Sequence, residues 1–166
     1  MSLTITQKSL YIVIYNATMI GRSIGKTINK NKLLSYKQAL FLEVVILCKK
    51  MDNRTLTNKN IINSIEKLSK KHIISFGQSQ KAINVILKNH CLLFEKNNIH
   101  SIKKELDCPL DSIVLKHLNI KSSLTKMNKT NYIKIQNDIQ KNLKYKYKID
   151  LDSIWDEQNI NKIFIN

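Results

Sequence analysis

Two ionisable residues, each at the start of an expected helix, are the side chains in this sequence best suited to chemistry. Lys81 follows the turn at Gly77 and opens a helix with an apolar face, and Asp111 comes just after the single proline, Pro109. A lysine amine can act as a nucleophile, and a carboxylate can stabilise the positive charge that develops during its attack. Taken singly, Lys81 fits a solvated lysine and Asp111 fits a carboxylate that stabilises a helix N-terminus. Together they are the candidate catalytic pair.

Other kinds of site have weaker support in the sequence. Gly21 and Gly25 are separated by three residues, whereas a phosphate-binding P-loop needs four, so nucleotide hydrolysis is not expected. No nucleophile elbow accompanies the serines. Several histidines and cysteines fall in one segment, but their spacing matches no zinc motif, and we expect neither a metal nor a cofactor. These residues are His90, Cys91, His100, Cys108 and His117.

The charge of the chain points to a polyanionic partner. The 166 residues contain 28 Lys and Arg against 12 Asp and Glu, which gives a net charge of +16. Such an excess suits nucleic acid. Only Arg22 and Arg54 are arginines, and lysine contacts phosphates as a point charge, whereas reading guanine edges favours arginine. The composition therefore predicts binding to the nucleic-acid backbone.

The remaining composition indicates a helical protein inside the cell. With 3 Gly and 1 Pro the chain has too few turn residues for a β-sandwich or barrel. The three cysteines lack paired spacing, which fits a reducing compartment and a cytoplasmic location. The apolar run 10–20 is broken by polar residues and lacks a basic leader, so we expect neither a signal peptide nor a membrane span.

These features predict one compact, multi-helix, all-α domain over residues 1–166. The segment Ser35–Lys50 is apolar on nearly all sides and is expected to be the central buried helix. Residues 94–106 are a basic connection without a clear period, and residues 1–34 receive no functional role. The expected helices cover residues 5–20, 35–50, 57–71, 79–90, 109–118, 129–143 and a short segment from 151.

Two segments around the candidate pair resemble the helix-hairpin-helix DNA glycosylases of the endonuclease III superfamily. Residues 76–87 (FGQSQKAINVIL) resemble the second half of the hairpin with its catalytic lysine, and residues 109–115 (PLDSIVL) resemble the segment with the catalytic aspartate. Residues 124–136 and 151–155 are similar, more weakly, to the C-terminal helices of archaeal 8-oxoguanine glycosylases. The chain differs from the family at Ser79, where the second hairpin glycine is expected, and at Ile113, where the family has histidine. It also has no four-cysteine iron–sulfur loop.

The resemblance implies a base-excision DNA glycosylase and AP lyase with a helix-hairpin-helix-like element over residues 72–118. The hairpin at Gly77 would grip DNA phosphates, and a damaged base would be flipped out of the stack. Lys81 would attack the sugar carbon and form a Schiff base, with Asp111 as its charged partner. DNA is expected more than RNA, and the oligomeric state is left open. The residues expected to contact nucleic acid are Gly77, Gln78, Ser79, Gln80 and Asn84.

Two non-catalytic alternatives use the same residues. Helices at 35–50, 57–71 and 79–90, followed by the basic 94–104 as a wing, also fit a winged-helix DNA-binding or transcription-regulatory protein. In that arrangement Gln78, Gln80, Lys81 and Asn84 would line a recognition helix. The run Lys144–Lys148, which alternates lysine with tyrosine, would suit a structural partner of RNA through charge and stacking.

Overall fold

Helices are the regular elements of the part of the chain that the structure describes. The computed structural model describes residues 4–19, 24, 27–94, 99–141 and 146–152, and within these ranges it contains no strand. The prediction of an all-α fold is confirmed. In chain order the elements are α1 (Ile5–Met19), α2 (Lys30–Asp52), α3 (Asn58–His72), α4 (Phe76–Phe94), α5 (Ile99–Lys103), α6 (Ser112–His117), the 3₁₀ helix η1 (Leu124–Lys126), α7 (Lys129–Lys141) and the 3₁₀ helix η2 (Lys148–Asp152).

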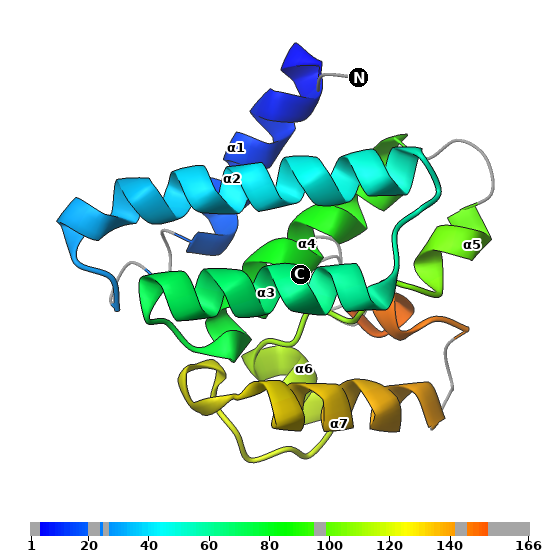
Figure 1. The fold of residues 1–166 in the computed structure, drawn as a ribbon. Helices are drawn as coiled ribbons and strands as arrows, with labels where there is room; N and C mark the ends of the chain where they lie inside the picture. The colour runs from blue at the N-terminus through cyan, green and yellow to red at the C-terminus, as the bar shows by residue number, and fades with distance from the viewer. Residues whose placement is uncertain (1–3, 20–23, 25–26, 95–98, 142–145, 153–166) are drawn as a thin grey trace, which may run out of the picture.

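The central helix is α4. It packs against α1, α2, α3, α5, α7 and η1, and in Figure 1 it runs behind the antiparallel pair α2 and α3. Its core residues Ile83, Ile86 and Leu87 are fully buried. A helix that touches neighbours on all sides needs apolar or internally bonded residues around its whole circumference.

The prediction that residues 35–50 form the central helix is therefore wrong. This segment lies in α2, which begins earlier, at the N-cap Asn29, and buries only one face. Leu34, Leu42 and Ile46 on α2 are among the most exposed large apolar residues of the described chain. Hydrophobic periodicity identifies the exposed face of a helix by its polar residues. The exposed face of α2 is itself apolar, so the sequence pattern could not distinguish it from the buried face.

The connection from α3 to α4 is short and sharply turned. Thr57 caps α3 in a capping box with Asn60, as its sequence position predicts. The helix ends at Ile73, which adopts the left-handed conformation with φ of 53° and donates its N–H to Ser69. Helix α4 then begins at Phe76, earlier than the predicted start at Ser79. Gly77 consequently lies inside the first turn of α4 and not in the connection that was expected to form a hairpin.

The chain after α4 forms a smaller layer below α3 and α4 (Figure 1). The short α5 stands in the basic connection, after which residues 107–111 run as a buried, extended segment into α6. Helix α7 packs beside α4, and η2 packs on α7. The winged-helix layout does not fit, because its expected wing contains α5 and its expected recognition helix is the buried α4. None of the described helices is both long and apolar enough to cross a bilayer.

Candidate functional site

The structure brings the two candidate catalytic residues together. Lys81 Nζ lies 3.5 Å from Asp111 Oδ2 although 30 positions separate the two residues in the sequence. The Lys81 side chain is 29% exposed and that of Asp111 is 10% exposed, so the amine faces the surface and the carboxylate lies beneath it. A nucleophile and its charged partner must converge on one reacting atom, and this distance allows them to do so.

Each member of the pair is held by the backbone around it. Asp111 is the N-cap of α6, and its Oδ1 accepts hydrogen bonds of 2.9 Å from the N–H groups of Ile113 and Val114. The capping oxygen and the oxygen that faces Lys81 are different atoms, so the carboxylate serves both contacts at once. Lys81 projects from the second turn of α4, where its neighbour Gln80 is fully buried. The amine thus projects from the central helix of the fold.

A chain of buried hydrogen bonds lies directly below the pair. Gln80 pairs with the backbone of Leu110, accepting from its N–H at 3.2 Å and donating to its carbonyl at 2.6 Å. Asn84 donates to Gln80 Oε1 at 3.1 Å and to the Tyr132 hydroxyl at 2.8 Å. Tyr132 in turn donates to Asp107 at 2.7 Å. Burial, and then the charge of Asp107, raises the pKa of the Tyr132 phenol well above its usual value, which keeps the donated proton in place.

A second glutamine holds the same extended segment from the other side. Gln136 of α7 accepts from the Cys108 N–H at 3.1 Å and donates to the Cys108 carbonyl at 2.7 Å. Lys148 of η2 pairs with the buried Asp107. Asp107, Tyr132, Gln136 and Lys148 were not predicted as part of the site. The polar residues at positions 80 and 84, one turn apart within an apolar helix, were the one sequence signal that could have indicated the network.

The five residues predicted to contact nucleic acid are all buried. Four of them are at most 2% exposed: Gln78, Ser79, Gln80 and Asn84. Gln78 bonds to Ser75 and Thr27, and Gly77 donates its N–H to the Met127 carbonyl at 3.2 Å. The N-terminal turn of α4 is thus covered by η1. The prediction that these residues contact phosphates does not fit this burial.

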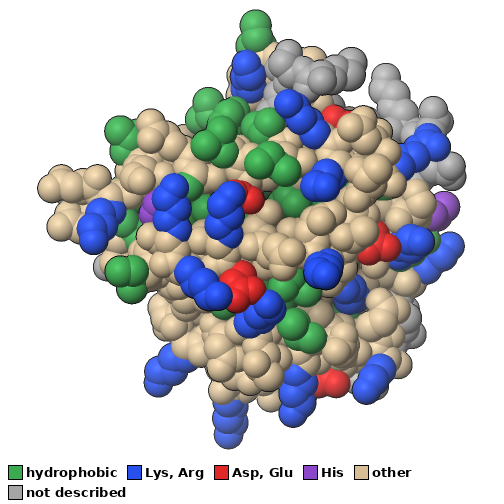
Figure 2. Space-filling view, viewed as in Figure 1, with side chains coloured by type: hydrophobic (Ala, Val, Ile, Leu, Met, Phe, Trp, Pro, Cys, Tyr) green, Lys and Arg blue, Asp and Glu red, His purple; other side chains and the backbone are tan. Residues whose placement is uncertain are grey.

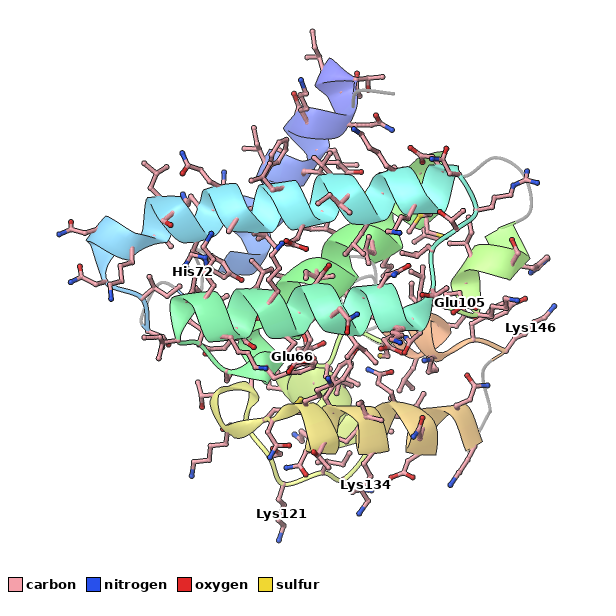
Figure 3. All side chains as sticks on the ribbon, in the orientation of Figure 1. Glu66, His72, Glu105, Lys121, Lys134 and Lys146 are labelled. Carbon is pink, nitrogen blue, oxygen red and sulfur yellow. The ribbon has the colours of Figure 1, made fainter. Side chains whose placement is uncertain are left out.

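Lysines gather instead on the layer formed by α6, η1 and α7. Residues 112–141 contain six lysines and one acid, Asp138. One of the six, Lys129, pairs with Glu66 of α3 at 2.5 Å. Figure 3 shows Lys121 and Lys134 projecting from the lower edge of this layer, away from the body, and Figure 2 shows further cations along that edge. We name as the C-terminal lysine surface the exposed residues Lys116, Lys121, Lys126, Lys134 and Lys141.

A second buried polar chain lies away from the pair, between α1, α2 and α4. The Tyr11 hydroxyl oxygen is 2.9 Å from Cys48 Sγ and 2.5 Å from His90 Nδ1, and His90 Nε2 is 3.0 Å from Asp52 Oδ1. Burial is the main reason that the pKa of Cys48 is raised to about 12 and that of Tyr11 is raised further above its usual value. Cys48 and Tyr11 are therefore protonated at neutral pH. The chain satisfies polar groups in the core, and sequence did not predict it.

The thiols and imidazoles do not assemble into a metal site within the described residues. Cys48, Cys91 and Cys108 are buried thiols that form no disulfide, and the described part of the chain contains no group of three potential ligands. Burial, and then the charge of Asp152, raises the pKa of Cys108. The raised pKa values of Cys48 and Cys108 oppose both metal binding and nucleophilic attack by these two thiols.

Comparisons with protein-family models, with curated proteins and with solved structures find no match to this chain. The likeness to DNA glycosylases stays a prediction that rests on residues 76–87 and 109–115.

Proposed function

We propose that this protein binds nucleic acid through its phosphate backbone, using the C-terminal lysine surface. The observation that carries the proposal is the charge of the α6–η1–α7 layer: six lysines against the single Asp138 over residues 112–141. Each of the five exposed lysines can displace a condensed counterion from a phosphate, which is the main source of non-specific affinity. Duplex DNA is the first partner to test, because the resemblance to glycosylases favours DNA over RNA.

The lysine-rich character of this surface also sets the expected mode of binding. Lysine offers three donors on a flexible stem and lacks the planar fork with which arginine reads guanine. No arginine lies within residues 112–141. We therefore expect affinity that depends strongly on salt and weakly on base sequence.

The proposal is tested by titrating fluorescein-labelled duplex DNA with the protein at several salt concentrations and following anisotropy. The triple variant Lys121→Ala, Lys126→Ala and Lys134→Ala should bind more weakly, and the slope of log K against log salt should fall by up to about 0.9 for each lost phosphate contact. A matched triple variant on other helices, Lys32→Ala, Lys49→Ala and Lys59→Ala, removes the same charge from exposed positions. Equal losses in both triple variants would show that net charge alone, and not this surface, binds DNA.

A second function, cleavage at abasic sites, is favoured by the 3.5 Å distance between Lys81 Nζ and Asp111 Oδ2. In this reaction the neutral amine would add to the C1′ aldehyde of an abasic site and form an N–C bond. The aldehyde oxygen would leave as water, with one proton from the amine and one from solvent, and an iminium ion would remain. The iminium carbon withdraws electrons, so the C2′ proton would be lost to water, the C3′–O bond would break and the 3′ phosphate would leave with that electron pair. Asp111 would stabilise the positive charge on the nitrogen once the amine has added to the aldehyde.

The second function has a covalent test. Borohydride donates hydride to the iminium carbon, so the protein should become permanently linked to duplex DNA that carries an abasic site. Lys81→Arg keeps a cation beside Asp111 but removes the nucleophilic amine, and it should abolish the link. Lys67→Arg, an exposed position that pairs with Glu43, is the matched control and should leave trapping unchanged. Absence of any trapped product, with salt-dependent DNA binding retained, would reject cleavage and leave the binding function standing.

A further inference from the structure

An open apolar groove lies on the opposite part of the molecule from the C-terminal lysine surface. It has a volume of about 500 Å³ and lies between α1 and α2, with Ile86 of α4 among its lining residues. Its lining is mostly apolar or aromatic and includes Tyr11, Ile12, Phe41 and Val44. Buried core residues such as Val44 form its floor, and neither Lys81 nor Asp111 is among its lining residues.

The apolar character continues outside the groove along both helices. On α1, Ile12 is 56% exposed and Val13 is 64% exposed, and on α2, Leu42 is 61% exposed. Leu34 and Ile46 extend the exposed apolar surface along α2 in both directions. In Figure 2 the hydrophobic side chains form a cluster in the upper part of the view, where α2 crosses α1 in Figure 1. A contiguous exposed apolar surface of this kind marks an interaction site in soluble proteins.

Positive charge borders this apolar surface. Lys8 of α1 and Lys37 of α2 both line the groove. The two acids of α1 and α2 face elsewhere: Glu43 is buried against Ser64 and Lys67 of α3, and Asp52 contacts His90. Any partner that fills the groove therefore gains by carrying acidic groups beside an apolar stripe.

From this combination we infer that the α1–α2 groove binds an acidic amphipathic helix of a partner protein. Such a helix would place apolar side chains spaced i, i+3, i+4 and i+7 against Ile12, Phe41 and Leu42, and its flanking carboxylates near Lys8 and Lys37. The bound helix would then lie between α1 and α2, over Ile86 of α4. This site is separate from the proposed nucleic-acid surface and does not depend on it.

Other occupants account for less of the surface. A small ligand that filled about 500 Å³ would leave Val13, Leu34 and Ile46 exposed. A second copy of this chain would bring the same lysines together in a protein of net charge +16, which opposes self-association. A bilayer surface would meet the outer apolar side chains but would not fill a groove lined by the buried Tyr11 and Val44.

The experiment uses the full chain and a labelled synthetic peptide of about 18 residues, long enough for several helical turns. The peptide carries leucines at the spacing above and glutamates along both flanks, and a scrambled peptide of the same composition is the control. Anisotropy should show saturable binding of the designed peptide and at least about tenfold weaker binding of the scrambled one. Palmitate and phosphatidylserine vesicles are titrated in parallel.

Variants at exposed positions identify the site. Ile12→Ser and Leu42→Ser should each weaken peptide binding several-fold, whereas Ile73→Ser, an 83% exposed residue of the α3–α4 connection, should not. The double variant Lys8→Glu, Lys37→Glu should bind the glutamate peptide more weakly than the wild type does. It should bind a peptide with lysines in place of the glutamates more tightly. The inference is overturned if both peptides bind equally, if Ile73→Ser weakens binding as much as Leu42→Ser, or if only palmitate or vesicles bind.

Discussion

At the scale of single residues, Asp111 has two roles that can be separated. Its Oδ1 caps α6 through two backbone N–H groups, and its Oδ2 faces Lys81. An asparagine retains a capping oxygen and loses the charge, whereas an alanine loses both. The two substitutions therefore distinguish the structural role of Asp111 from its electrostatic role.

We expect Asp111→Ala to lower the free energy of unfolding by about 1 kcal/mol, the usual cost of a lost N-cap. Asp111→Asn should cost less than about half as much, because a partly exposed ion pair adds little to stability. Urea unfolding monitored by circular dichroism gives both values. If the two variants were equally destabilised, the ion pair and not the cap would be the main contribution of Asp111 to folding.

Gly77 has no room for a side chain. A Cβ added there would lie 2.4 Å from the carbonyl oxygen of Leu124 and 2.7 Å from Met127 Cβ. The obstructing Leu124 oxygen belongs to the backbone, so it cannot move without displacing η1. This close approach, and not phosphate binding, is the reason for glycine in the observed fold.

Gly77→Ala should consequently destabilise the protein by about 1–3 kcal/mol, the usual cost of forced overpacking. Alanine improves helix propensity by about 1 kcal/mol, but the clash with backbone outweighs it. Urea unfolding measures the loss. Asn63→Ala, on the exposed face of α3, is the control and should be neutral or slightly stabilising. Wild-type stability in Gly77→Ala would contradict the packing of η1 on α4.

At the scale of elements, two amides fix the segment 107–111. Gln80 of α4 and Gln136 of α7 each bond to both the N–H and the carbonyl of one residue, Leu110 and Cys108 respectively. A buried extended segment without strand neighbours would otherwise leave these backbone groups unpaired at a cost of about 1–3 kcal/mol each. The two glutamines thereby supply the hydrogen bonds that a neighbouring strand would otherwise supply. They hold the segment in a position in which Asp111 lies beside Lys81.

Helices α3 and α7 are joined by an acid that lies between two lysines. Glu66 pairs with Lys70 at 2.7 Å and with Lys129 at 2.5 Å, and it lies between the two helices in Figure 3. Hydrogen bonds from Lys129 and then Lys70 lower the pKa of Glu66 from 4.5 to about 2. Because the folded state lowers this pKa, the stabilisation is present above about pH 4.5 and is lost as the pH falls toward about 2.

Glu66→Gln should therefore be less stable than the wild type at pH 7, and the difference should shrink from about pH 4.5 and vanish near pH 2. Urea unfolding of both proteins at three pH values across this range gives the comparison. Asp138→Asn, an exposed acid on α7, should show no such trend. A difference that did not change between neutral and acid pH would exclude the ion pairs as its cause.

At the scale of the whole molecule, the two proposed surfaces lie on different layers. The apolar groove belongs to α1 and α2, and the C-terminal lysine surface belongs to α6, η1 and α7; Figure 1 shows the two layers at opposite sides of α3 and α4. Because α3 and α4 lie between the two surfaces, both partners can be bound at once. The protein would then hold an acidic helix close to a nucleic-acid backbone.

Simultaneous binding gives a prediction for the intact molecule. Saturating duplex DNA should change the Kd of the labelled helical peptide by less than about threefold, since screening by salt confines charge effects to roughly 10 Å. Competition anisotropy at physiological ionic strength measures this. Displacement of the peptide by stoichiometric DNA would show that the two ligands share one surface.

Much of the local structure was predictable from the sequence. The low glycine and proline content predicted an all-α chain, and the helix expected over residues 57–71 corresponds to α3, Asn58–His72. The adjacency of Lys81 and Asp111 was also predicted, through the two resembling segments. The helices depend on residue type and local spacing. The contact between Lys81 and Asp111 joins segments 30 positions apart, and only the resemblance indicated it.

The tertiary structure alone decided which surfaces face solvent. Gln78, Gln80 and Asn84 looked like surface polar residues but are buried, because their partners Thr27, Leu110 and Tyr132 are distant in the sequence. The apolar run in α2 looked like a core helix but leaves Leu42 exposed, because α4 takes the centre. Sequence determined the helices and the net charge of +16, since both are sums of local properties. The structure determined burial and the position of the sites, since these depend on which distant segments meet.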